Sequence, residues 1–238
     1  MSSKKQQHIR YDRIIFSALL IGGAIAILVS FINGIVNGAQ PKDKNSSSDS
    51  SVSDSVNSTI GTTDGLSGSV YLSPSNQYEN KYASGDTSEG EQMHIISGQV
   101  KSLLEQTGLK VYEPDTAYSL SDKVYQANEL NVDIYVSIQS NSGGSQGTEC
   151  FYNTKNENSK LLSECIYKYV SPLTPTADRG INGGNSSKLY EILFTDSPVC
   201  LVEVEFHDNP EQAEWIIQNT SGLAESIADG IIEYFQKI

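Results

Sequence analysis

The chain has 238 residues, of which 29 are acidic and 16 basic, and its formal net charge at pH 7 is −13. This length suits one ordinary domain with appendages. The negative charge argues against nucleic acid as a partner, because nucleic-acid-binding surfaces need an excess of Lys and Arg. The three cysteines, Cys150, Cys165 and Cys200, have no CxxC spacing, so they indicate small buried thiols rather than a disulfide framework or a zinc ribbon.

The segment 14–36 reads IIFSALLIGGAIAILVSFINGIV and has no charged residue. As a helix it would be roughly 35 Å long at about 1.5 Å per residue, which is enough to cross a bilayer. The flank 1–13 carries four Lys and Arg residues, so this flank should stay in the cytoplasm and the rest of the chain should be exported. The uncharged stretch is longer than a typical signal-peptide core, which favours an uncleaved, single-pass membrane anchor over a cleaved signal.

The segment 37–67 that follows is rich in Ser, Asp and Gly and has almost no apolar content. Such a composition cannot bury enough surface to order itself. We therefore predict a flexible linker between the anchor and a folded domain over 68–238.

From residue 68 onward, apolar strands alternate with amphipathic helices. The predicted strands cover 69–73, 109–113, 132–138, 147–153, 188–193 and 198–206. The predicted helices cover 87–108, 119–130, 158–173, 209–219 and 221–238. This alternation predicts an α/β fold with a mostly parallel sheet covered by helices on both faces. Functional side chains of such folds gather at the carboxyl ends of the strands.

Several stretches together resemble one known family. They are VYLSPSNQYEN, VDIYVSIQSNSGG, LTPTADRGI and LYEILFTDSPVCLVEVEFHDNPEQAEWI. Their order and spacing are similar to those of the zinc-dependent N-acetylmuramoyl-L-alanine amidases, which cut peptidoglycan between muramic acid and the stem peptide. The resemblance covers about 70–238, and SPSNQ resembles a subgroup from clostridial-type bacteria. It implies peptidoglycan as the partner and a domain on the extracellular side of a bacterial membrane.

The family's chemistry needs a zinc ion with three protein ligands and an open position, which lowers the pKa of a bound water and polarises the amide carbonyl. A separate glutamate moves the proton. By resemblance, the glutamate ligand at the start of the first helix matches Glu89, with Glu91 as an alternative in the same turn. The general base matches Glu203.

The two histidine ligands of the family have no counterpart in this chain. Their positions fall on Asn76 and Gln139, with Glu79 an alternative to Asn76 if the loop is aligned differently. Amide oxygens are poor partners for zinc beside imidazole and carboxylate ligands. The resemblance therefore implies zinc for the family, whereas the residues present argue against it here.

The predicted strand LVEVEF suggests residues that could replace the two missing histidine ligands. Glu203, Glu205 and His207 share a face if the strand is regular, and with Glu89 they could bind a metal through oxygen-rich ligands. Alternatively, His207 lies past the strand end and bonds to backbone. His94, five residues after Glu89, should face elsewhere on its helix.

Two further residues are candidates for substrate binding. Asn141 follows the central predicted strand, and Arg179 lies in ADRGI, where a structural role is equally open. Two hypotheses follow from the whole pattern. The chain is either a membrane-anchored peptidoglycan amidase with a divergent metal site, or a zinc-less pseudo-amidase that binds peptidoglycan or a partner protein.

Overall fold

The structure is a computed structural model that describes residues 65–185 and 189–238. The predicted anchor 14–36, its flank 1–13 and nearly all of the linker 37–67 lie outside these residues. Among the residues described, no helix is both long and apolar enough to cross a bilayer.

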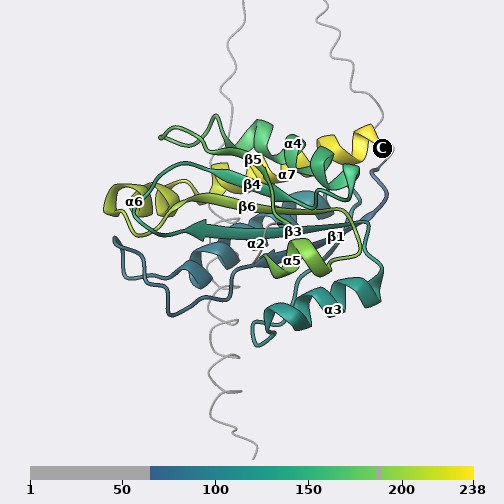
Figure 1. Cartoon of the computed structure of the whole chain (residues 1–238), viewed down its shortest axis with the longest axis horizontal. Coiled ribbons are helices and arrows are strands. Elements are labelled where there is room, and N and C mark those ends of the chain that lie inside the picture. The colour runs from purple at the N-terminus through teal and green to yellow at the C-terminus, as the bar shows by residue number, and fades with distance from the viewer. Residues whose placement is uncertain (1–64, 186–188) are drawn as a thin grey trace, which may run out of the picture. The chain divides into compact units, whose positions relative to one another are not determined.

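The domain is built on one six-stranded sheet with the strand order β2-β1-β3-β6-β4-β5 (Figure 1). All neighbouring strands are parallel except β4 and β6, which are antiparallel. The predicted mostly parallel sheet is therefore confirmed, and the structure places β1, β3 and β6 side by side in it. The strands are β1 (Ser69–Pro74), β2 (Lys110–Tyr112), β3 (Ile134–Asn141), β4 (Glu149–Tyr152), β5 (Gly180–Gly183) and β6 (Val199–Phe206).

Helices cover both faces of the sheet, as predicted. One face packs against α2 (Glu89–Glu105), α4 (Glu157–Val170) and α7 (Thr220–Lys237). The other packs against α3 (Leu120–Leu130) and α5 (Tyr190–Phe194), which lie together in Figure 1. The remaining helix, α6 (Pro210–Gln218), follows β6.

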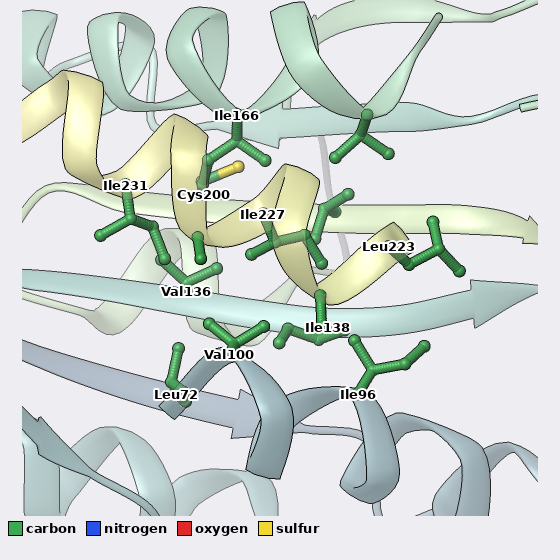
Figure 2. Packing of buried hydrophobic residues seen from close by; sticks show 14 of the residues in the cluster. Leu72, Ile96, Val100, Val136, Ile138, Ile166, Cys200, Leu223, Ile227 and Ile231 are labelled. Atoms are coloured by element: carbon green, nitrogen blue, oxygen red, sulfur yellow. The ribbon is translucent and has the colours of Figure 1, made fainter. Parts of the chain in front are cut away.

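The larger core lies on the α2/α4/α7 face. Alternate residues of the strands point into it, as the period of two requires. Figure 2 shows Leu72 of β1, Val136 and Ile138 of β3, and Cys200 of β6 meeting apolar side chains of the helices. Fully burying each Leu, Ile or Val side chain contributes roughly 1.5–3 kcal/mol, so this face supplies most of the apolar stabilisation that holds the strand ends in place.

Polar residues at the helix starts fix where those helices begin. Ser88 accepts a hydrogen bond from the backbone N–H of Glu91, so Glu89 becomes the first residue of α2. Ser119 and Asp122 form a capping box at the start of α3. These caps satisfy N–H groups that have no partner within the helix, and they anchor both helices at the carboxyl end of β1 and β3.

One sequence prediction was wrong at element level, and one strand was missed. Residues 188–193 were predicted as a strand, but the structure has the short helix α5 there. Glu191 and Ile192 are both buried whereas Leu193 and Phe194 are exposed, a one-sided pattern of a helix rather than an alternation. The edge strand β5, with the sequence GING, was not predicted because it carries only one apolar side chain.

Candidate functional site

The candidate site lies where the carboxyl ends of β1, β3 and β6 meet. Gln139 of β3 pairs directly with Glu203 of β6, and Glu203 in turn pairs with Glu149 of β4. Glu89 begins the helix that follows β1. The structure therefore brings Glu89, Gln139 and Glu203 to one end of the sheet, where parallel sheets carry their functional residues.

Glu203 is a partly buried carboxylate surrounded mainly by negative charge. Its Oε2 accepts a hydrogen bond from Nδ2 of Asn141. Burial, followed by the charge of Glu149, raises the pKa of Glu203 to about 7, with Arg179 opposing the rise and Glu89 adding to it. A carboxylic acid with a pKa near neutrality can both accept and release a proton at physiological pH.

The raised pKa of Glu203 has a measurable consequence for stability. Between its unfolded value of 4.5 and its folded value of about 7, the folded state binds more protons than the unfolded state, so stability falls as pH rises through this window. Glu203→Gln should therefore raise the free energy of unfolding by up to ~3 kcal/mol at about pH 8, since one pKa unit corresponds to about 1.4 kcal/mol, and change it little at about pH 4. Urea unfolding at both pH values measures the difference.

A matched control for this variant is Glu105→Gln at the exposed end of α2. It should change stability by less than about 0.5 kcal/mol at either pH. An effect of Glu203→Gln that is the same at both pH values would contradict the assigned environment of Glu203.

Glu89 is buried, with only 1% of its surface exposed. Its Oε2 accepts from Nδ2 of Asn80 at 3.0 Å, whereas its Oε1 is buried and has no hydrogen-bond partner among the residues described. The alternative residue Glu91 instead accepts from the hydroxyls of Ser88 and Thr87 at the helix cap. Glu89 therefore offers the site a buried oxygen without a partner, whereas Glu91 is exposed at the helix cap.

Both polar atoms of the Asn76 side chain form hydrogen bonds within the protein. Its Nδ2 donates to the backbone carbonyls of Thr116 and Tyr118, each at 3.0 Å, and its Oδ1 lies 2.8 Å from Nε2 of His94. Because the amide already donates to two carbonyls, the oxygen must accept, so Nε2 of His94 carries the proton. That nitrogen cannot bind a metal in this arrangement. The alternative residue Glu79 is exposed on the same loop.

Gln139 forms a hydrogen bond to the carboxylate of Glu191, a residue that the sequence analysis did not single out. Its Nε2 donates to Oγ of Ser137 and to Oε2 of Glu191, at 3.1 and 3.2 Å. Glu191 is 1% exposed and also accepts from the hydroxyls of Ser73, Tyr135 and Ser137. Gln139 is thus part of a buried polar network under α5.

Glu205 and His207 do not share a regular face with Glu203. Gln139 pairs with Glu203 but Asn141 pairs with Phe206, so β6 has one extra residue at this point, which is a β-bulge. The bulge redirects both side chains and explains why the period of two fails here.

The side chains of Glu205 and His207 both contact neighbouring residues of the protein. Glu205 is fully buried and accepts from the backbone N–H of Gly147 at 2.6 Å and from the hydroxyl of Thr176 at 2.6 Å. It thereby fixes the glycine-rich loop between β3 and β4. His207 follows the strand end, stacks on Tyr82 with ring centroids 5.2 Å apart, and bonds to the Ser140 hydroxyl through Nδ1. The predicted partner of His207 was backbone, and the observed partner is this side chain.

Arg179 links two segments of the chain through hydrogen bonds of its guanidinium group. Its Nε donates to Glu149 at 2.8 Å and its Nη1 to Ser145 at 3.0 Å, and its guanidinium lies over the Phe206 ring. The Arg179 side chain remains 38% exposed. The cation therefore holds the loop after β3 against β4 and β6 and moderates the charge around Glu203.

The donor set at this end of the sheet does not fit a zinc ion. The buried Oε1 of Glu89 is one suitable oxygen. Position 76 offers an amide oxygen that already accepts from His94, and position 139 offers a neutral amide that is held through its Nε2 donors. Zinc sites in proteins use three or four His, Cys, Asp or Glu ligands. Within residues 65–185 and 189–238, no three such side chains are placed to hold a metal.

The chain is similar to known cell-wall amidases. LytC, an N-acetylmuramoyl-L-alanine amidase of Bacillus subtilis, is 28% identical over 179 residues, and an uncharacterized cell wall amidase of Bacillus anthracis is 33% identical over 134 residues. These alignments cover 71% and 50% of the chain, but only 36% and 24% of the lengths of those two proteins.

A solved structure has the same fold. It is the catalytic domain of the amidase CwlV from Bacillus (Paenibacillus) polymyxa, which is 29% identical, with a TM-score of 0.63 over 71% of this chain and 98% of that one. Residues 70–233 match the family Amidase_3, described as N-acetylmuramoyl-L-alanine amidase. The chain therefore belongs to the Amidase_3 family of N-acetylmuramoyl-L-alanine amidases.

Proposed function

We propose that this protein binds cell-wall peptidoglycan through an amidase domain that no longer hydrolyses it with zinc, and that segment 14–36 holds the domain at the outer side of a bacterial membrane. One observation carries the proposal. Asn76 and Gln139, where the family resemblance puts histidine ligands, are neutral amides engaged in hydrogen bonds inside the protein. The clostridial-type subgroup indicated by SPSNQ stays a prediction.

The alternative function is that of an active amidase with a rebuilt metal site. Glu203, with its pKa of about 7, favours it as a group suited to proton transfer. Against it, Glu205 and His207, the proposed replacement ligands, already bond to Gly147, Thr176 and Ser140. A zinc-less binding module is therefore the better supported function.

The full chain should co-sediment with purified peptidoglycan and release no stem peptides from it. Neither a metal chelator nor Glu203→Ala should change the bound fraction, because binding would not depend on a metal or on proton transfer. Sedimentation and chromatographic assay of released peptides measure the two properties. A zinc-loaded amidase of the family serves as the positive control for peptide release.

The contrary result is release of stem peptides that both the chelator and Glu203→Ala abolish. That result would establish the alternative function and a working metal site. Failure to co-sediment with peptidoglycan at all would exclude the binding role.

The anchor prediction has its own test. Protease added to intact protoplasts should remove the domain 68–238 and leave a short membrane fragment, because the basic flank 1–13 keeps the N-terminus in the cytoplasm. Immunoblotting with antibodies to the domain follows the loss. Survival of the full-length chain on intact protoplasts, together with its digestion after lysis, would contradict the proposed orientation.

A further inference from the structure

Exposed apolar side chains concentrate on α3 and α5, the two helices that lie together on one face of the sheet (Figure 1). Among residues 65–185 and 189–238, eight large apolar side chains are exposed, and six of them belong to these short helices. The six are Leu120, Tyr125, Leu130, Tyr190, Leu193 and Phe194. Exposed apolar side chains that gather in this way mark interaction surfaces, whereas single ones need no explanation.

Four of the six form a continuous surface, which we call the aromatic patch. Tyr190 and Phe194 are one turn apart on α5, their ring centroids lie 4.5 Å apart, and Leu193 is exposed beside them. Asn128 of α3 donates from Nδ2 to the carbonyl of Phe194 at 2.9 Å. Tyr125 is three residues before Asn128 and therefore its neighbour on the helix surface. Tyr125 is 68% exposed and Phe194 is 54% exposed, so the patch is open to a partner.

A groove of about 620 Å³ continues the aromatic patch along α3. It is lined by Tyr118, Asp122, Tyr125, Gln126, Glu129 and Leu130. Tyr125 belongs to both the groove and the patch, so the two form one surface. The groove gives this surface a concave part, and side chains that fill such pockets carry most of the binding energy of an interface.

The charged side chains around this surface are acidic. Asp122 and Glu129 line the groove on α3, Asp196 follows α5, and all three are exposed. Within the described part of the chain, none of the three forms an ion pair. Lys123, the only Lys or Arg on the two helices, is 3% exposed, and Lys188, which precedes α5, lies outside the described residues.

This charge distribution selects the occupant of the surface. A second copy of the chain in a two-fold contact would bring two acidic rims together, and like charges across an interface are unfavourable. The anionic lipids of a membrane surface would be repelled in the same way. A partner that carries positive charge is attracted instead.

We propose that the aromatic patch and its groove bind a basic protein segment that presents apolar side chains with Lys or Arg beside them. The apolar side chains pack on Tyr125 and Phe194 and fill the groove, as in the binding of an amphipathic helix. The Lys or Arg residues face Asp122, Glu129 and Asp196. The inference does not rest on the proposed function, because it uses none of the residues assigned to the candidate site.

The test uses the full chain in nanodiscs of phosphatidylcholine, with empty nanodiscs as the blank. The probe is a fluorescent helical peptide of about 14 residues, with Leu and Phe along one face and Lys on the rest. Fluorescence anisotropy should show that it binds at least about tenfold more tightly than the same peptide with Glu in place of Lys. A scrambled peptide of identical composition should also bind at least about tenfold more weakly, because it has no apolar face.

Two double variants separate the apolar and the charged contributions. Tyr125→Ala with Phe194→Ala should weaken binding of the Lys peptide at least about tenfold, because aromatic anchors dominate interface energies. Glu129→Gln with Asp196→Asn should weaken binding about threefold and reduce the loss of affinity caused by added salt. All four positions are exposed, so both variants should fold, which circular dichroism checks.

The chain offers matched controls on other surfaces. Ile95 and Ile238 are the remaining two exposed large apolar residues of the described chain, and Glu105 and Glu164 are exposed acids of α2 and α4. Ile95→Ala with Ile238→Ala, and Glu105→Gln with Glu164→Gln, should bind the Lys peptide like the wild type. Weakening by these controls as large as that of the matched patch variants would overturn the proposal.

The remaining outcomes identify other occupants, and each would overturn the proposal. Equal binding of the Lys and Glu peptides would show that the surface does not select charge. A dimer in light scattering that Tyr125→Ala with Phe194→Ala dissociates would assign the surface to a second copy. Quenching of Phe194→Trp by brominated lipid, above that of the wild type, would assign it to the membrane. Loss of co-sedimentation with peptidoglycan in the variant Tyr125→Ala with Phe194→Ala would assign it to the wall.

Discussion

The double variant Asn76→His with Gln139→His is expected to acquire about one zinc ion per chain, from near zero in the wild type. The two imidazoles would join the buried Oε1 of Glu89, which has no hydrogen-bond partner among the described residues. Two histidines, one glutamate and an open position form a common catalytic zinc site. Elemental analysis after dialysis against zinc measures the gain.

The substitution carries a local cost. Asn76 gives up its bonds to the carbonyls of Thr116 and Tyr118, and Gln139 gives up its bond to Glu191. The matched control is Asn158→His with Gln236→His, two exposed positions of the same residue types, which should gain no stoichiometric zinc. If the double variant folds and still binds none, the assigned positions of the missing ligands are wrong.

Removing the buried carboxylate of Glu191 should have the largest effect on stability. Glu191→Ala leaves the hydroxyls of Ser73, Tyr135 and Ser137 and the amide of Gln139 without their common acceptor. Buried donors that lose a charged partner cost several kcal/mol, so the free energy of unfolding should fall by about 3–5 kcal/mol. Urea unfolding gives the value.

Glu164→Ala provides the comparison on the surface. Glu164 lies 3.5 Å from Lys160 on α4, and about half of each side chain is exposed, 49% and 57%. An exposed ion pair of this kind contributes less than about 1 kcal/mol. A loss for Glu191→Ala as small as that for Glu164→Ala would show that the hydroxyl network does not depend on this carboxylate.

The fold was predictable where an apolar pattern extends over a whole strand or over several helical turns. The apolar runs of 132–138 and 198–206 and the amphipathic stretches 87–108 and 119–130 predicted the central strands and two helices correctly. The helix α5 was missed because five residues hold barely more than one turn, too few for a period to stand out. The role of Glu191 was hidden for the same reason.

The site was predictable only as far as the family resemblance reached. It located Glu89 and Glu203, which the structure brings to the same end of the sheet. It could not locate the bulge in β6, because one extra residue leaves no mark on the pattern of LVEVEF. Nor could it predict that His94 would contact Asn76, since that contact depends on how the loop after β1 folds over α2.

The zinc content of the wild-type chain tests the central proposal most directly. The full chain is dialysed against excess zinc, then against metal-free buffer, and bound zinc is counted by elemental analysis beside the double histidine variant. We expect less than about 0.1 zinc per wild-type chain, because Asn76 and Gln139 offer only engaged, neutral amides. Zinc bound at about one ion per wild-type chain, together with peptidoglycan hydrolysis that Glu203→Ala abolishes, would contradict the proposal and establish this protein as an active amidase.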